Sequence, residues 1–298
     1  MRYPASVTIA EVGPRDGLQN EAARVSTADK IAFVDLLSAA GLLSIEVSAF
    51  VSPKWVPQMA DAADVFAGIA RRPGTRYSAL VPNLAGLERA EAAGVREIGI
   101  FAAASETFSK KNINQSIEAS LENYRGVCRR AVELGIRVRG YVSTAFGCPF
   151  EGDVAPQQVA AVSAALIDMG AFEVAVSDTI GIAHPGQVPA IVDVVASRIG
   201  IEKVALHFHD TRGTALANVL AALHLGVSTF DASAGGLGGC PYAPGATGNL
   251  ATEDLVYMLD GLEIETGVNL RALVEASAFM ESRVGHALAS RYFRAVHR

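Results

Sequence analysis

Short apolar runs rich in valine, isoleucine and alanine recur along the whole chain, and this recurrence restricts the fold more than any other feature of the sequence. Eight such runs have the length of buried strands, and stretches with helical periodicity separate them. The runs span residues 7–12, 43–50, 77–81, 97–103, 137–145, 172–178, 203–209 and 229–234. Strands that alternate with helices in this way are typical of parallel α/β folds.

The helical stretches complete a repeating strand–helix unit. They are clearest at residues 27–40, 57–70, 116–134, 155–169, 185–199 and 213–225. Eight such units in 298 residues match the size of a (β/α)8 TIM barrel. No linker rich in proline, glycine or serine divides the chain, so we predict a single catalytic domain over residues 1–298. Residues 250–298 exceed what the eighth unit needs, and we expect extra C-terminal helices there that cover a barrel end or a subunit contact.

A doubly wound open sheet is the alternative α/β architecture. That fold uses a GxGxxG phosphate turn directly after its first strand. The chain instead has the sequence GPRDG at residues 13–17. The barrel is therefore the favoured prediction.

Charge and composition exclude several classes of protein. The chain has 25 basic and 31 acidic residues, a net charge of −6, which disfavours nucleic acid as a partner. No apolar stretch approaches the roughly 18 residues that a membrane span needs, and the first four residues do not resemble a signal segment. We therefore expect a cytoplasmic protein with no membrane partner. The three cysteines, Cys128, Cys148 and Cys240, are scattered and indicate neither a disulfide framework nor a zinc knuckle.

Polar residues gather where the predicted strands end, at the mouth of the barrel where TIM-barrel active sites lie. His207 and His209 are two residues apart on one strand, so their rings leave the same face. Asp16 follows the first strand, which neighbours the last strands once the barrel closes. An imidazole pair with a carboxylate predicts a metal site, and mixed nitrogen and oxygen donors with open positions favour Mg²⁺ or Mn²⁺.

Three further charged residues flank this predicted site. Arg15 beside Asp16 could stabilise an oxyanion or enolate, or it could form a buried ion pair with Glu46, and the two roles are compatible. Asp178 could orient a ligand histidine or a bound water, or it could cap its own loop at residues 178–181.

A glycine-rich segment at residues 235–249 follows the eighth strand and is predicted to act as a lid. It carries Cys240, whose thiol could transfer a proton or act as a nucleophile. Asn249 could be the N-cap of a helix over residues 250–259, a role that Thr252 could also fill, or a ligand of a hard metal ion. Both roles of Asn249 stay open on these grounds.

A small basic group follows the fourth strand. Lys110, Lys111 and Asn112 could bind a phosphate-bearing cofactor or substrate, or could belong to a solvated loop. The remaining histidines have no such neighbours in the sequence and are not predicted to be catalytic. They are His184, His224, His286 and His297.

Several segments resemble the 3-hydroxy-3-methylglutaryl-CoA (HMG-CoA) lyase family, a branch of the metallolyase TIM barrels. The opening sequence EVGPRDGLQNE at residues 11–21 looks like that family's signature. The resemblance continues in order and spacing through residues 48–59, 104–114, 139–152, 177–182, 207–211 and 235–259. It therefore covers nearly the whole chain.

The resemblance implies roles for individual residues. Asp16, His207, His209 and Asn249 would bind the divalent cation, and His207 would also relay a proton. Arg15 would stabilise an enolate, Cys240 would transfer a proton, and Glu46 and Asp178 would support them. The implied reaction cleaves HMG-CoA to acetyl-CoA and acetoacetate in leucine degradation, and the implied assembly is a homodimer.

Other functions are weighed against this one. A related lyase could act on a branched 3-hydroxy-3-alkylglutaryl-CoA, and a Claisen-condensing acyltransferase of the same superfamily could form the bond instead. A third possibility is a barrel that binds metal or CoA without catalysis. The Cys240 segment and the short chain favour the lyase.

Overall fold

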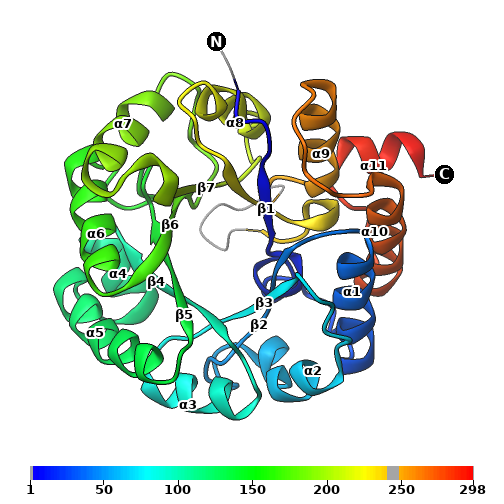
Figure 1. Ribbon diagram of the computed structural model, residues 1–298, viewed down its shortest axis with the longest axis horizontal. Helices are drawn as coiled ribbons and strands as arrows, with labels where there is room; N and C mark the ends of the chain where they lie inside the picture. The colour runs from blue at the N-terminus through cyan, green and yellow to red at the C-terminus, as the bar shows by residue number, and fades with distance from the viewer. Residues whose placement is uncertain (1–2, 240–247, 298) are drawn as a thin grey trace.

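A closed ring of parallel strands forms the centre of the molecule in the computed structural model, which describes residues 3–239 and 248–297 (Figure 1). The strands follow one another around the ring in chain order, and β1 pairs with both β2 and β8. They are β1 (Thr8–Glu11), β2 (Ser44–Ala49), β3 (Arg76–Leu80), β4 (Glu97–Ala103), β5 (Arg137–Ser143), β6 (Ala171–Asp178), β7 (Val204–Phe208) and β8 (Thr229–Ala232). The predicted (β/α)8 barrel is confirmed.

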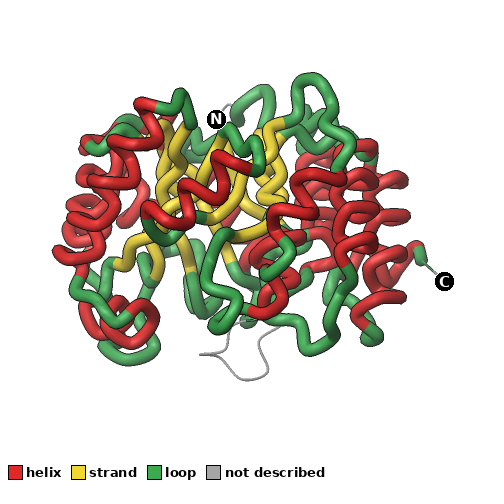
Figure 2. The backbone as a smooth tube through the Cα atoms, turned by 90° about the horizontal axis from the view of Figure 1, so that it is seen from below, coloured by secondary structure: helices red, strands yellow, loops and turns green. Residues whose placement is uncertain are grey.

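The strands form where the apolar runs predicted them because both of their faces are covered. One face points into the barrel and the other packs against helices, so every residue of β2 and β7 is buried. The ring closes in the register that places Ile9 beside Phe230 and Ala10 beside Asp231. Figure 2 shows the strands enclosed between helices, with loops at both ends of the barrel.

Helices follow the strands and form the outer layer. Several helices have an N-cap residue whose side chain accepts a hydrogen bond from a backbone N–H of the first turn. These residues are Ser26, Asn83, Ser105 and Ser116. The helices from the first to the eighth strand are α1 (Thr27–Ala39), α2 (Ala62–Gly68), α3 (Leu84–Ala92), α4 (Glu106–Ile113), α5 (Ile117–Glu133), α6 (Pro156–Asp168), α7 (Val188–Ile199) and α8 (Ala215–Leu223). Single turns of helix are η1 (Gly13–Gly17), η2 (Pro57–Met59), η3 (Ile201–Lys203) and η4 (Ala234–Gly236).

The C-terminal part forms α9 (Thr252–Gly261), α10 (Leu270–Val284) and α11 (Arg291–Val296). α10 packs against α1 and α9, so it lies between these two helices in the outer ring (Figure 1). The expected extra C-terminal helices are confirmed. Of the two positions expected for them, α10 does not cover an end of the barrel, because it packs beside α1.

Among the described residues, none of the helices combines the length and the apolar character needed to cross a lipid bilayer.

Candidate metal and active site

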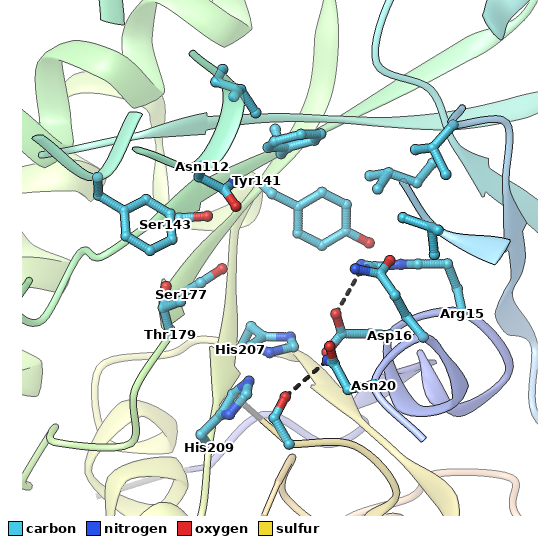
Figure 3. Close-up of a pocket in the computed structure, with 18 residues that line it drawn as sticks. Arg15, Asp16, Asn20, Asn112, Tyr141, Ser143, Ser177, Thr179, His207 and His209 are labelled. Carbon is cyan, nitrogen blue, oxygen red and sulfur yellow. Dashed lines mark hydrogen bonds and ion pairs between the residues drawn. The ribbon is translucent and has the colours of Figure 1, made fainter. Parts of the chain in front are cut away.

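Three of the predicted ligands meet at the carboxyl end of the barrel. Asp16 lies in η1, directly after β1, while His207 is on β7 and His209 is just beyond it. One potential ligand atom of each residue lies within 4.8 Å of the others. Figure 3 shows the three side chains converging on one side of a cavity. The ring closure between β8 and β1 brings residues from opposite ends of the chain into this cluster.

Asn249 lies beside the cluster because its backbone pairs with the residue that follows β7. Residues His209 and Asn249 form an antiparallel bridge. The buried Asn249 amide donates to Asp16 Oδ2 over 3.0 Å and to the Leu237 carbonyl over 3.1 Å. Its role as an N-cap is wrong, because α9 begins after Ala251 without a side-chain cap. Thr252, the other candidate cap, lies inside the first turn.

The unpaired acceptors of this cluster suit a divalent cation. Among the described residues, buried His209 Nδ1 and Asn249 Oδ1 have no hydrogen-bond partner. Burial and the neighbouring His207 lower the pKa of His209 to about 4, so its ring is neutral and can act as a ligand. Although burial opposes the effect, Arg15 and the two histidines lower the pKa of Asp16 to about 2. A carboxylate, imidazoles and an amide oxygen are together a donor set that fits Mg²⁺ or Mn²⁺.

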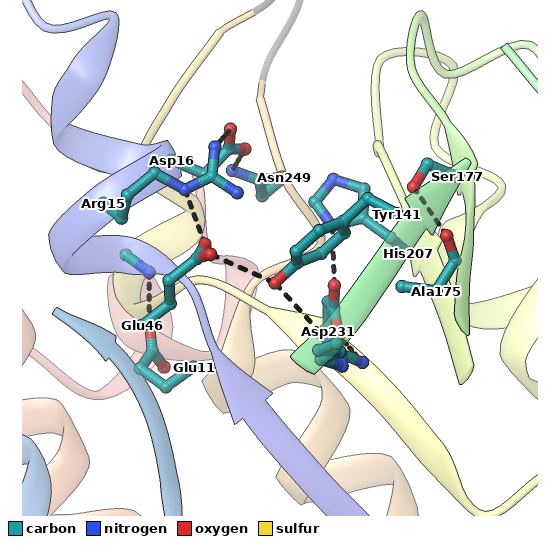
Figure 4. Close-up of polar contacts among 12 residues, drawn as sticks. Glu11, Arg15, Asp16, Glu46, Tyr141, Ala175, Ser177, His207, Asp231 and Asn249 are labelled. Carbon is teal, nitrogen blue, oxygen red and sulfur yellow. Dashed lines mark hydrogen bonds and ion pairs between the residues drawn. The ribbon is translucent and has the colours of Figure 1, made fainter. Parts of the chain in front are cut away.

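A buried carboxylate behind His207 was not found from the sequence. Asp231 Oδ2 on β8 lies 3.2 Å from His207 Nδ1, and Asp231 Oδ1 accepts from Arg139 Nη2 over 2.8 Å (Figure 4). This contact fixes the orientation of the His207 ring and leaves Nε2 to face the cluster. The available signal was one aspartate in an otherwise uncharged strand, together with arginine and tyrosine at alternate positions of β5.

Arg15 forms the buried ion pair with Glu46 that the sequence suggested, and it also contacts Asp16. Its Nε donates to Glu46 over 2.5 Å and its Nη1 donates to Asp16 over 2.6 Å. Glu46 also accepts from the hydroxyl of Tyr141 over 3.3 Å, and Tyr141 lies on the cavity wall. Burial raises the pKa of Glu46, and the Arg15 charge opposes that rise. The guanidinium is therefore held rigidly at the edge of the cavity.

Asp178 binds its own loop. Its two oxygens accept from the backbone N–H groups of Ile182 and Ala183 over 3.0 and 3.1 Å. Burial raises its pKa to about 6. Its neighbours Ser177 and Thr179 line the cavity. The arrangement matches the loop-capping alternative.

The basic group on α4 is divided between the cavity and solvent. Asn112 lines the cavity. Lys110 pairs with Glu106 on the exposed face of the helix, and Lys111 Nζ lies 3.9 Å from the centre of the Phe150 ring. The two lysines therefore lie near the mouth without lining its wall.

Cys240 lies outside the described residues. The segment that leads to it approaches the cavity, since Gly239 lines the wall and its carbonyl accepts from Asn20 over 2.9 Å. The other two cysteines, Cys128 and Cys148, are free and buried.

The cavity has a volume of about 290 Å³ and two contrasting sides. The polar side holds Arg15, Asp16 and the two histidines. The apolar side comes from the loop after β2, from β3, from β4 and from α4. It consists of Val51, Val56, Leu80, Phe101, Phe108 and Ile113.

The closed barrel with an Asp–His cluster at its mouth defines a candidate metalloenzyme of the TIM-barrel class. The chain belongs to the HMGL-like family, whose sequence model matches residues 6–280. The resemblance to HMG-CoA lyases is thus confirmed.

The similar proteins match over nearly their full lengths. The 3-hydroxy-3-isohexenylglutaryl-CoA/hydroxy-methylglutaryl-CoA lyase of Pseudomonas aeruginosa is 54% identical over 99% of this chain and 99% of its own. A hydroxymethylglutaryl-CoA lyase of Bacillus subtilis is 50% identical over 98% of this chain and 97% of its own. The crystal structure of a Pseudomonas aeruginosa hydroxymethylglutaryl-CoA lyase matches with a TM-score of 0.98 and 54% identity, covering 99% of both chains.

Proposed function

We propose that this protein is a divalent-metal-dependent lyase that cleaves HMG-CoA to acetyl-CoA and acetoacetate. The observation that carries the proposal is the cluster of Asp16, His207 and His209 beside Arg15 at the mouth of the barrel. Relatives that are at least half identical to this chain over nearly its whole length bear the name of this lyase.

Asp16, His207, His209 and Asn249 would hold the cation, for which we propose Mg²⁺ or Mn²⁺. When bound, such a cation draws electron density from the substrate oxygens near it, which eases loss of the hydroxyl proton. The protein prepares this set of ligands through its own contacts. Asn249 donates both amide hydrogens to Asp16 and Leu237, so its oxygen is directed away from them.

Cleavage breaks the bond between C2 and C3 of the acyl group and leaves its electron pair on C2 of the thioester. We assign stabilisation of this negative charge to Arg15. Its Nε and Nη1 are held by Glu46 and Asp16, and Nη2, which takes part in neither contact, can donate to the enolate oxygen. A fixed cation in a cavity shielded from water stabilises a developing enolate strongly.

Two proton movements balance the reaction. The substrate hydroxyl loses a proton as it becomes the ketone of acetoacetate, and C2 gains one as it becomes the methyl group of acetyl-CoA. We assign the relay of the first proton to His207, whose Nδ1 adjoins Asp231. We assign delivery of the second to Cys240.

Acetoacetate formation by the purified protein tests the proposal directly. We expect product with Mg²⁺ or Mn²⁺, none after chelation with EDTA, and recovery when metal is returned. His207→Ala should abolish turnover, whereas His184→Ala, which alters an exposed histidine outside the cavity, should not. Folded, metal-replete His207→Ala protein that cleaves HMG-CoA at the wild-type rate would refute the assignment.

A longer branch at C3 is a second candidate substrate feature, and the apolar side of the cavity favours it. Six apolar side chains from four elements offer more contact than one methyl group needs. The Pseudomonas aeruginosa relative carries an isohexenylglutaryl-CoA substrate in its name. The test compares kcat/KM for HMG-CoA and for 3-hydroxy-3-isohexenylglutaryl-CoA. Activity on the methyl substrate alone would restrict the function to HMG-CoA.

We also propose that residues 1–298 form one catalytic domain and that the protein assembles as a homodimer. Light scattering coupled to size-exclusion chromatography measures the second point. A mass near the 31.1 kDa of one chain would overturn it.

A further inference from the structure

Glu11, the last residue of β1, is fully buried beneath the candidate metal site and is not one of its predicted ligands. Its carboxylate accepts three hydrogen bonds. Oε1 accepts from Gly13 N over 2.8 Å and from Ala234 N over 2.9 Å, and Oε2 accepts from the Thr252 hydroxyl over 2.7 Å. Figure 4 shows Glu11 on the side of Glu46 away from the cavity residues.

The three donors belong to three segments that carry or contact the proposed oxygen ligands Asp16 and Asn249. Gly13 begins η1, which presents Asp16. Ala234 begins η4, and the residue after that turn, Leu237, accepts a hydrogen bond from the Asn249 amide. Thr252 follows Asn249 by three residues at the start of α9. One carboxylate thus joins the backbones that carry both oxygen ligands of the proposed cation.

The space around this carboxylate is filled. A Cβ atom on Gly13 would lie 2.6 Å from Glu11 Oε1, so a larger residue there would displace the carboxylate. A second buried carboxylate, Glu253, supports the same turn, because its oxygens accept from Gly235 N over 3.0 and 2.9 Å and from the Ser277 hydroxyl. The turn is therefore held from two sides.

We infer that Glu11 is a positioning residue that fixes the distance between Asp16 and Asn249 and thereby sets the affinity of the site for its divalent cation. The inference rests on the proposed metal site. It assigns Glu11 no contact with substrate or cation. Its effect passes through backbone, since Gly13 and Ala234 are held by their N–H groups. Mutation of residues that hold metal ligands in place typically lowers metal affinity by about 10- to 100-fold.

Binding of Mn²⁺ alone, followed by isothermal titration calorimetry, measures this effect without turnover. Glu11→Ala should raise the Kd by about 10- to 100-fold. Thr252→Val keeps the shape of the side chain but removes one donor, and it should raise the Kd by a smaller factor. Glu11→Gln should stay close to wild type, because its amide oxygen can accept from both N–H groups and its NH₂ can donate to Thr252.

A matched control separates positioning from general loss of stability. Glu97 is also buried, but it is the first residue of β4 and therefore lies at the opposite end of the barrel. Glu97→Ala should lower the melting temperature and leave the Mn²⁺ Kd within about twofold of wild type, since no proposed ligand depends on it.

The outcomes distinguish this inference from the proposed function. Wild-type protein that binds no Mn²⁺ would overturn the metal site and this inference with it. Wild-type protein that binds Mn²⁺, together with folded Glu11→Ala protein of unchanged Kd, would overturn the inference alone. If Glu11→Ala does not fold, Thr252→Val decides, and an unchanged Kd for that variant is likewise a refutation.

Discussion

The two ends of the barrel both contain buried charge, but they use it differently. At the amino end, the Glu97 carboxylate lies between the guanidinium groups of Arg76 and Arg137, at 3.4 and 3.2 Å. At the carboxyl end, buried His209 Nδ1 and Asn249 Oδ1 have neither a hydrogen-bond partner nor an ion-pair partner among the described residues. Charge that is paired within the protein supports stability, whereas acceptors left over at the mouth point to a ligand.

Loss of Arg15 should have the largest effect of any change that tests this contrast. Arg15→Met keeps much of the apolar stem but removes the charge that faces the enolate, so kcat should fall by about 10²- to 10³-fold. The assay is acetoacetate formation at saturating HMG-CoA and metal.

The matched change at the other end is Arg137→Met. Arg137 pairs with Glu97 and packs over the Phe172 ring, so its loss should lower the melting temperature and leave kcat within about twofold. Equal losses of kcat in the two variants would show that the ends of the barrel are not functionally distinct.

Asp231 should affect metal affinity as well as stability, because it faces His207 and also pairs with buried Arg139. Asp231→Asn removes the negative charge that faces His207 Nδ1, so we expect the Mn²⁺ Kd to rise by about 10- to 100-fold. Calorimetric titration measures the Kd, and Glu97→Gln serves as the buried carboxylate control. A Kd that changes equally in both variants would argue against a specific link to His207.

Much of the fold follows from local sequence, whereas the supporting carboxylates do not. A strand such as β4 was predicted at its observed bounds because its apolar run is a property of neighbouring residues. The approach of His207 and His209 also followed from the two-residue period of a strand. Asp231 and Glu11 were missed, because their partners lie far away in the chain. Arg139 and Asp231 are 92 positions apart, and Glu11 and Ala234 are 223 apart.

The buried carboxylate of Glu253 should give stability a pH dependence. Burial raises its pKa to about 7, with nearby Glu11 adding to the rise. The folded protein therefore keeps a proton that the unfolded chain releases above its ordinary pKa of 4.5. Since the folded state binds more protons over this range, its stability falls as pH rises from about 4.5 to 7 and stays lower above 7.

Glu253→Gln mimics the protonated side chain and should remove that part of the dependence. Urea unfolding at pH 5 and pH 8 should show that the wild type loses about 1–3 kcal/mol more than the variant between the two values. Glu11 remains in the variant, so some dependence persists. If the two proteins lose the same unfolding free energy between pH 5 and pH 8, Glu253 is ionised over that whole range.

Lys111 should give the smallest effect, because it lies near the mouth but outside the cavity wall. An exposed ammonium group attracts a phosphate with about 1 kcal/mol or less, so Lys111→Ala should raise KM for the acyl-CoA by up to about fivefold. The kcat value should not change, since the reacting atoms are not touched. The increase should disappear at high ionic strength, where exposed charges are screened. An unchanged KM at low salt would assign Lys111 to a solvated surface. The charged groups that contribute to substrate binding would then be those that line the cavity.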